Sequence, residues 1–216
     1  MTAIAIDGPG GAGKSTIAKL VAKKLNIDYI DTGAMYRAIA FKTVKNNVEV
    51  SDDDGIKAML EDTDIDFRAG SIYLDGICVD KEIRTPEISQ MASKVSALAP
   101  VREKLVDIQR KMGHEKSVIM DGRDIGTNVL TDADHKFFMT ASAEERAQRR
   151  YKELIEKGED VSFEQVLSDI NQRDKNDMER ELNPLRKADD AIELDTTGLS
   201  IEEVVDMILK NVVTEK

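Results

Sequence analysis

Residues 8–15 read Gly-Pro-Gly-Gly-Ala-Gly-Lys-Ser and fit the pattern G-x-x-x-x-G-K-[ST]. They follow a short apolar run, Ala3–Asp7, and precede residues 16–25, in which apolar side chains recur at helical spacing. A strand, a glycine-rich loop and a helix in this order form the context in which the pattern binds nucleotide phosphates. We call Gly8–Ser15 the phosphate-binding loop.

The residue types of this loop suit an anion. Glycines let backbone N–H groups surround phosphate oxygens, and the following helix N-terminus adds a partial positive charge. Lys14 is placed to reach the β- and γ-phosphates, and the Ser15 hydroxyl is placed to ligate Mg²⁺. The alternative is a glycine-rich turn with an accidental lysine. The context favours the first interpretation, with nucleotide contacts from Gly8, Pro9, Gly10, Gly11, Ala12, Gly13, Lys14, Ser15 and Thr16.

The composition limits the class of protein. A chain of 216 residues with 41% hydrophobic and 34% charged residues predicts one globular domain, with room for an inserted subdomain. No apolar run approaches the length of a membrane span, and the early first strand leaves no room for a signal peptide. The single cysteine, Cys78, fits a reducing cytoplasm and predicts a small core or strand residue.

The charge argues against a polymeric nucleic-acid ligand. The net charge is −11, so a general field that attracts long nucleic acid is not expected. Half of the twelve arginines nevertheless fall between Arg146 and Arg186, as local binding of a phosphate would require. No heptad seam or long exposed apolar stretch indicates a dimer, so we expect a monomer.

Strand and helix patterns alternate along most of the chain. They predict a five-stranded parallel sheet with helices on both faces, an α/β fold. The expected strands are Ala3–Asp7, Asp28–Asp31, Ser117–Asp121, Lys136–Met139 and Ala191–Asp195. Thr32 is the expected N-cap of a helix from about Ala34 to Lys45. Capping boxes at Ser142, Ser162 and Ser200 predict three further helix starts.

One region departs from this alternation. Between Asp64 and Thr85 apolar and polar residues alternate, and the dipeptide Asp75-Gly76 separates two short strand patterns. This predicts a β-hairpin and therefore a small antiparallel insert.

Three strand ends carry candidate site residues. In open parallel sheets ligands bind at the carboxyl ends of strands, where the phosphate-binding loop, residues 31–37 and residues 121–124 should converge. Arg37 and Arg123 would hold a phosphate and Asp124 would accept from a base or sugar. Alternatively, Arg37 is an exposed helical charge, and Arg123 and Asp124 form a salt-bridged turn. Asp121 ends its strand where it can hold Mg²⁺ through water, or merely cap the next element.

Two arginine groups lie farther along the chain. Arg146, Arg149 and Arg150 share one helical face, which is either a solvated stripe or a clamp for donor phosphates. Arg173, Asp177 and Arg180 also share a face. They form either ordinary ion pairs or a grip on a substrate hydroxyl and on the moving phosphoryl group. The segment from Arg173 to Lys187 is a solvated face, a mobile lid, or both.

The residues together suit phosphoryl transfer, which needs positioning and charge neutralisation. An Asn-Lys-x-Asp sequence is absent, so guanine recognition of the G-protein type is unsupported. Further stretches then point to a family, in order along the chain: Ile6–Thr16, Asp31–Arg37, Glu82–Thr85, Val101–Glu103, Asp121–Thr127, Glu144–Arg150, and Arg173-Asp174 with Asp177. With these, the whole chain resembles the bacterial cytidylate kinases, which belong to the P-loop nucleoside monophosphate kinases.

This resemblance implies an ATP-dependent kinase for CMP or dCMP that uses Mg²⁺. It implies catalytic roles for Lys14, Arg123, Arg173 and Arg180, with Arg180 near the transferring phosphate. ATP would be held by Gly8–Thr16, Arg146 and Arg150, and the metal by Ser15 and Asp121. The implied acceptor contacts are Thr32, Tyr36, Arg37, Ser93, Arg102, Arg123, Asp124, Arg173 and Asp177. Among them, Ser93, Arg102 and Asp124 would recognise cytosine.

The resemblance also implies a division of the chain. The core would be residues 1–50 and 100–216, the monophosphate-binding insert about 51–99, and the lid about 150–187. Two departures stand out: Thr32 replaces a frequent serine, and residues 175–180 are less basic than in some relatives. The rival readings are a P-loop kinase for UMP, AMP or shikimate, and a nucleotide-hydrolysing switch.

Overall fold

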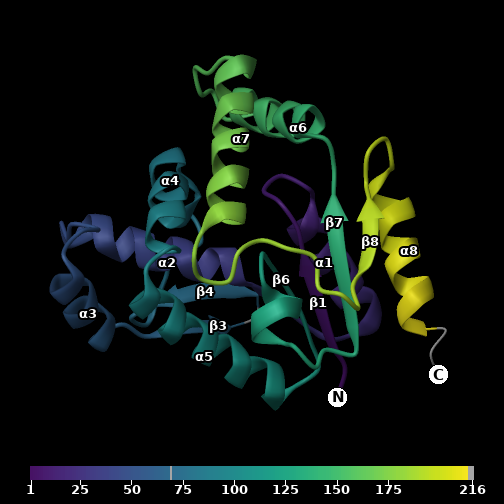
Figure 1. The fold of residues 1–216 in the computed structure, drawn as a ribbon, viewed down its shortest axis with the longest axis horizontal. Helices are drawn as coiled ribbons and strands as arrows, with labels where there is room; N and C mark the ends of the chain where they lie inside the picture. The colour runs from purple at the N-terminus through teal and green to yellow at the C-terminus, as the bar shows by residue number, and fades with distance from the viewer. Residues whose placement is uncertain (69, 214–216) are drawn as a thin grey trace.

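A central parallel sheet organises the molecule, and the computed structural model describes residues 1–68 and 70–213. Its five strands run in the order β2-β6-β1-β7-β8 (Figure 1). The strands are β1 (Ala3–Asp7), β2 (Asp28–Asp31), β6 (Val118–Gly122), β7 (His135–Thr140) and β8 (Ile192–Asp195). Every pairing between them is parallel. The predicted α/β fold and all five predicted strands are confirmed.

Helices cover both faces of this sheet. The helices of the described residues are α1 (Lys14–Leu25), α2 (Thr32–Lys45), α3 (Asp53–Glu61), α4 (Pro86–Val95), α5 (Ala99–Glu115), α6 (Ala143–Glu156), α7 (Phe163–Glu179) and α8 (Ile201–Val213). Helices α1 and α8 cover one face of the sheet, and α2 and α5 cover the other. Alternate side chains of the strands point to opposite faces. In β1, Ile4 and Ile6 pack with α1 and α8, whereas Ala5 packs with the core that contains α2 and α5.

The antiparallel insert is also confirmed. Strands β3 (Ile65–Arg68), β4 (Ser71–Leu74) and β5 (Ile77–Cys78) form a three-stranded sheet in that order. Asp75 and Gly76 both have positive φ, at 51° and 78°, as the two-residue hairpin turn requires. The insert continues through the 3-10 turn η1 (Glu82–Arg84) into α4. Its apolar residues join the same core as α2 and α5.

Helices α6 and α7 have a small core of their own. It consists of Ala147, Leu154 and Val166 with flanking side chains, among which Tyr151 and Phe163 meet edge to face with centroids 6.2 Å apart. In Figure 1, α7 stands between α4 and α6. Polar side chains of both helices contact the main body: Arg146 of α6 donates to the Gly10 carbonyl, and Asp177 of α7 pairs with Arg123.

One local prediction was wrong, and two other details became clear only in the structure. Asp31, and not Thr32, caps α2, because its carboxylate accepts from the Ala34 amide at 2.8 Å. Residues after β6 form a π-helical turn, η2 (Ile125–Val129), which the sequence pattern did not indicate. Cys78 lies on a strand, as expected, but it is exposed and not part of the core.

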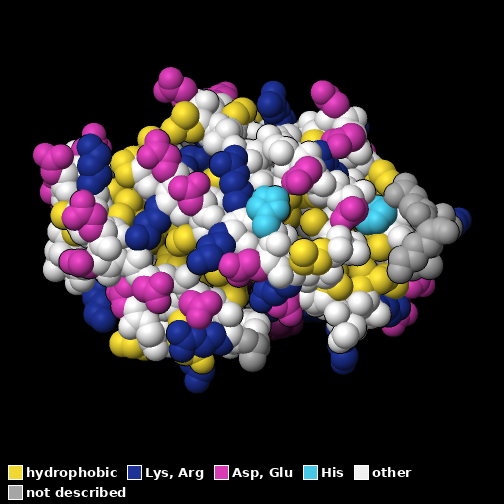
Figure 2. Space-filling view, turned by 90° about the horizontal axis from the view of Figure 1, so that it is seen from below, with side chains coloured by type: hydrophobic (Ala, Val, Ile, Leu, Met, Phe, Trp, Pro, Cys, Tyr) yellow, Lys and Arg dark blue, Asp and Glu magenta, His cyan; other side chains and the backbone are white. Residues whose placement is uncertain are grey.

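The surface shows no preference for one sign of charge on the face seen in Figure 2, where acidic and basic side chains are interspersed. Within residues 1–68 and 70–213, no helix is long and apolar enough to cross a membrane.

Candidate active site

The carboxyl ends of β1, β2 and β6 meet at one edge of the sheet. β6 lies between β2 and β1, and its Asp121 is opposite Ile6 of β1 on one side and opposite Asp31 of β2 on the other. The phosphate-binding loop follows β1, and Arg123 and Asp124 follow β6. The convergence expected from the sequence is therefore present.

Lys14 is the cation of the loop, and its side chain is buried, with an exposed fraction of 5%. Its Nζ donates to the Pro9 carbonyl oxygen at 2.8 Å. Burial, followed by the charge of Arg123, lowers the Lys14 pKa to about 7, against the opposing effect of Asp121 and Asp7. The ammonium group is thus held inside the loop and aimed by the loop's own backbone.

Asp121 meets the loop at Ser15. The Ser15 Oγ donates to one carboxylate oxygen at 2.9 Å, and the Tyr29 Oη donates to the other at 2.7 Å. Burial, followed by the charge of Asp31, raises the Asp121 pKa. A hydroxyl beside a carboxylate suits the oxygen preference of Mg²⁺. In the described part of the chain, no group of three or more His, Cys, Asp or Glu side chains could hold a metal ion.

Two arginines meet at Asp31. Arg37 contacts its Oδ2 at 3.0 Å, and Arg84, which sequence reasoning did not single out, contacts the same atom at 3.3 Å. Burial opposes ionisation of Asp31, but the charges of Arg37 and Arg84 outweigh it and lower the pKa. Arg37 is therefore not a free surface charge.

Arg123 and Arg173 lie over the phosphate-binding loop. A Cβ on Gly10 would be 3.3 Å from a terminal nitrogen of Arg123 and 3.7 Å from Cδ of Arg173. Burial, followed by the positive charge of the neighbouring Arg123, lowers the Arg173 pKa to about 10. Asp177 pairs with Arg123 at 2.8 Å, so the predicted contact residue on α7 reaches the residue that follows β6.

Asp124 is surrounded by donors. Arg102 contacts its Oδ2, Asn128 donates to the same oxygen at 3.1 Å, and Arg180 contacts Oδ1 at 3.0 Å. Arg123 and Asp124 therefore do not pair with each other. Arg180 lies at Asp124 and not against the loop, where the transferring phosphate was expected.

The three arginines of α6 have different environments, although their spacing put them on one face. Arg146 is buried, and its three guanidinium nitrogens contact the carbonyls of Ala141 and Gly10 and the carboxylate of Asp174. Arg150 pairs with Glu153 at 3.0 Å. Arg149 is the one whose terminal nitrogen comes near Gly13, 3.9 Å from where a Cβ would be.

The remaining predicted acceptor residues line the same region. Thr32 is buried and donates to the Asp121 carbonyl at 2.7 Å. The Arg102 guanidinium lies 5.7 Å from the centre of the Tyr36 ring. Ser93 is half-buried on α4, and Arg102 donates to the nearby Ser96 carbonyl.

Sequence reasoning missed several residues of this site. They are Asp7, Tyr29, Arg84, Asn128 and Asp174, whereas Arg149 was already part of the proposed clamp for donor phosphates. The only signal of the missed residues was position: Asp7 and Tyr29 lie near strand ends, and Arg84 and Asp174 lie inside stretches that carried the resemblance.

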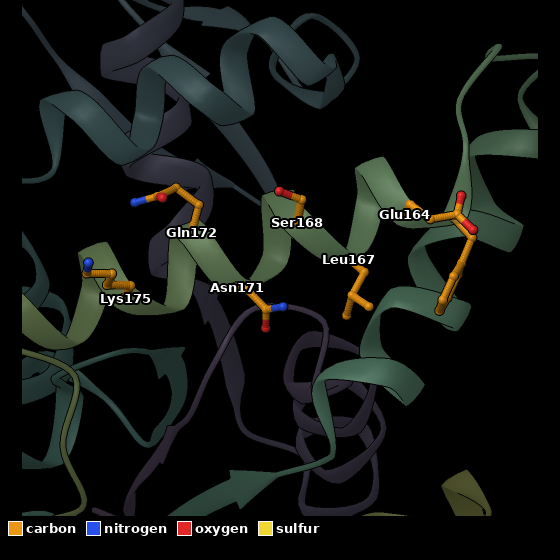
Figure 3. A pocket seen from close by; sticks show the side chains of 7 residues that line it. Glu164, Leu167, Ser168, Asn171, Gln172 and Lys175 are labelled. Carbon is orange, nitrogen blue, oxygen red and sulfur yellow. The ribbon is translucent and has the colours of Figure 1, made fainter.

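A separate hollow of about 550 Å³ runs along α7 (Figure 3). Its lining comes from this helix alone: Phe163, Glu164, Leu167, Ser168, Asn171, Gln172 and Lys175. None of these is a predicted site residue, so the hollow lies outside the candidate active site.

Comparisons with known proteins give a consistent result. The family described as Cytidylate kinase matches residues 4–214. A cytidylate kinase of Clostridioides difficile strain 630 is 53% identical over 209 residues, covering 97% of each chain. One of Caldicellulosiruptor saccharolyticus is 56% identical over 211 residues, covering 96% of this chain and 93% of that protein.

The solved structures support the fold at a greater distance. A shikimate kinase from Bacteroides thetaiotaomicron superposes with a TM-score of 0.50, covers 98% of both chains and is 13% identical. At that identity the likeness concerns the fold alone.

Proposed function

The chain belongs to the cytidylate kinase family, and on that premise we propose how it moves a phosphoryl group and which residues do so. Its activity is that of a cytidylate kinase, a phosphotransferase. The reaction we propose is transfer of the γ-phosphoryl group of ATP to CMP or dCMP. A phosphate oxygen of the acceptor forms a bond to the γ-phosphorus, the bond to the β-phosphate oxygen breaks, and ADP leaves.

The donor side of this proposal rests on the phosphate-binding loop. The backbone amides from Gly8 to Thr16 hold the phosphates, and Lys14 neutralises charge at the transferring group. Arg123 and Arg173, which lie over Gly10, would share that role. Ser15 and Asp121 would hold Mg²⁺, which supplies a charge between the phosphates. Arg149 is added to the ATP contacts because it lies nearest Gly13.

The acceptor side rests on one observation: Asp124 and Arg102 are buried and paired with each other, and Asp124 directly follows Arg123, which lies over the loop. An ionised Asp124 can only accept and Arg102 can only donate. Cytosine offers an N4 amine and an N3 acceptor, whereas uracil offers O4 and N3–H. The pair therefore fits cytosine at both positions and uracil at neither.

Other acceptor contacts follow from the same region. We propose that Arg37 and Arg123 hold the acceptor phosphate, that Ser93 assists with the base, and that Thr32, Tyr36, Arg173 and Asp177 surround the sugar. Arg180 would leave Asp124 for the phosphate when the acceptor enters. Arg146 and Arg150 remain proposed ATP contacts, although Arg146 would first have to release its protein partners.

The test is a comparison of kcat/KM for CMP, dCMP, UMP and AMP. The wild type should favour CMP over UMP by at least about a hundredfold, because a desolvated site rejects a ligand that leaves its polar groups unpaired. Asp124→Ala should shrink that ratio, chiefly through lost CMP activity. Asp132→Ala, at an exposed position, is the matched control. Full discrimination by Asp124→Ala would remove Asp124 from base recognition.

The rival functions are tested in the same assay. A kinase for another small acceptor would turn over a different member of the panel, extended with shikimate. A nucleotide-hydrolysing switch would release ADP at the same rate with and without a monophosphate.

We further propose that the chain works as a cytoplasmic monomer without a nucleic-acid polymer or membrane as partner. The net charge of −11 supports the part of this proposal that concerns nucleic acid. We also propose residues 1–50 and 100–216 as the core, about 51–99 as the insert and about 150–187 as the lid. The separate apolar cluster of α6 and α7 supports an independently moving lid.

A further inference from the structure

Asp7, the last residue of β1, is a buried carboxylate whose two oxygens are both committed. Its Oδ1 accepts from the Ile125 amide and its Oδ2 accepts from the Gly126 amide, each at 2.8 Å. The side chain is 4% exposed. The next residue, Gly8, opens the phosphate-binding loop. Asp7 therefore joins the start of that loop to a segment more than a hundred residues away.

The two amides belong to the residues that directly follow Arg123 and Asp124. Ile125 and Gly126 begin the π-helical turn η2, so their N–H groups have no partner earlier in a regular helix. The backbone of Asp124 just before them, at φ −145° and ψ 28°, lies outside the regular helix and strand regions. The carboxylate of Asp7 thus fixes where the chain goes immediately after the base-recognising residue.

The ionised carboxylate is the form of this side chain that can accept from both amides, and the fold keeps it buried. Burial raises the Asp7 pKa to about 6 even though both amides favour the ionised form, and Asp124 and Lys14 are the charged groups that act on it. Keeping this anion buried costs free energy. An asparagine would have avoided that cost, but its single oxygen accepts from one amide only, and its NH₂ group would face the other N–H.

We propose that Asp7 is a positioning residue that sets the separation between the phosphate-binding loop and the two consecutive residues Arg123 and Asp124. This proposal rests on the proposed role of Asp124 in base recognition. Asp7 then acts on kcat and on discrimination between acceptors. The affinity for ATP, which the loop backbone and Lys14 provide, depends on it little.

Asp7→Asn tests the proposal. We expect the CMP/UMP ratio of kcat/KM to fall at least about tenfold, the equivalent of one lost hydrogen bond to a charged group. The dissociation constant for ATP should change by less than about twofold to threefold. Asp134→Asn is the matched control, because Asp134 accepts from the Ala3 amide at 2.7 Å at the other end of the same strand. It should leave the ratio unchanged.

A second variant covers the case in which Asp7→Asn does not fold. Asp7→Glu keeps the charge and both acceptor oxygens but moves them outward by one methylene, about 1.5 Å. It should bind ATP normally and still lose discrimination, because the displaced carboxylate shifts η2.

The outcomes separate this inference from the proposed function. If Asp124→Ala loses discrimination while both Asp7 variants keep it, the positioning role is wrong and base recognition stands. Equal losses in ATP affinity and acceptor discrimination would make Asp7 a support of the loop only. A wild type that uses UMP as well as CMP would overturn the recognition of cytosine itself.

Discussion

Lys14 is a cation that the fold keeps almost entirely out of water. Among the residues that the structure describes, its ammonium group forms no salt bridge, and it donates to the Pro9 carbonyl oxygen. The pKa lowered to about 7 reflects this burial and the nearby Arg123. A buried charge without a counter-ion destabilises the fold, but it favours binding of an anionic ligand, because phosphates would supply the counter-charge.

Replacing this charge should separate catalysis from stability. Lys14→Met should lower kcat by several orders of magnitude, since a preorganised cation at developing charge contributes about 3–4 kcal/mol or more. The free energy of unfolding should not fall, because an apolar side chain of similar length removes a buried charge. Turnover by coupled assay and chemical denaturation measure the two effects.

The matched control is Lys23→Met, an exposed lysine on α1. Its turnover should match the wild type. Near-wild-type turnover in a folded Lys14→Met protein would contradict the assigned role of Lys14 in phosphoryl transfer.

Secondary-structure elements whose signals are local were predictable from the sequence. The hydroxyls of Ser142 and Ser162 accept from the amides three residues later, as their capping boxes indicated. The turn η2 was not predictable, because its first two amides are satisfied by Asp7, more than a hundred residues earlier. A pattern within η2 itself contains no record of that partner.

The same limit applied to the arginines of the site. Helical spacing correctly assigned Arg146, Arg149 and Arg150 to α6, but the partners of long side chains lie on other elements. Arg146 reaches Gly10 and Asp174, whereas Arg150 stays with Glu153. Sequence therefore indicated which cations gather near the loop and not which contact each one makes.

Helices α6 and α7 are the elements most suited to move as a unit. Their apolar cluster is separate from the two cores of the sheet. Asp177 of α7 pairs with Arg123 after β6, and Arg146 of α6, which pairs with Asp174 of α7, also contacts the Gly10 carbonyl of the phosphate-binding loop. ATP and CMP together would replace these ion pairs with contacts to phosphate and sugar. Closure of this kind keeps water from the transferring group.

We therefore predict a ligand-dependent change in hydrogen exchange. Amides of residues 146–150 and 173–187 should exchange more slowly when ATP and CMP are both bound than in the free protein. Amides of β1 and β6 should change little and act as the internal control. Strong and equal protection of the two segments in both states would exclude a lid formed by them.

Two of the three apolar clusters among the described residues share the sheet between them. One contains α1 and α8, and the other contains α2, α5 and the insert. The insert therefore has no core of its own, so we expect it to unfold with the sheet. Its helix α4 lies beside α7 in Figure 1, which agrees with the proposal that the acceptor binds between the insert and the lid.

Buried ionisable groups make the free energy of unfolding of the protein depend on pH. Asp7 has a pKa of about 6 when folded, against 3.8 as the reference. Between these values the folded state binds more protons at Asp7 than the unfolded state does. Its contribution to stability is therefore largest below about pH 4 and declines as the pH rises through about 6.

This predicts a pH-dependent difference between two proteins. The free energy of unfolding of the wild type minus that of Asp7→Asn should fall by up to about 3 kcal/mol between pH 4 and pH 7, the equivalent of that pKa difference. Denaturant titrations at intervals of pH measure it, with Asp134→Asn as the reference for other titrating groups. A difference that is constant with pH would show that Asp7 titrates normally.

The close packing of Gly8 affects how a mutational scan of this chain should be interpreted. A Cβ there would lie 2.0 Å from the Met139 carbonyl oxygen on β7, and φ is 145°. Every substitution should therefore reduce the amount of folded protein before phosphate binding is affected. A mutational scan that scores growth alone would assign Gly8 to nucleotide binding. A scan that also scores abundance would assign it first to the junction of two strands, and would show that an invariant motif position can have two independent causes.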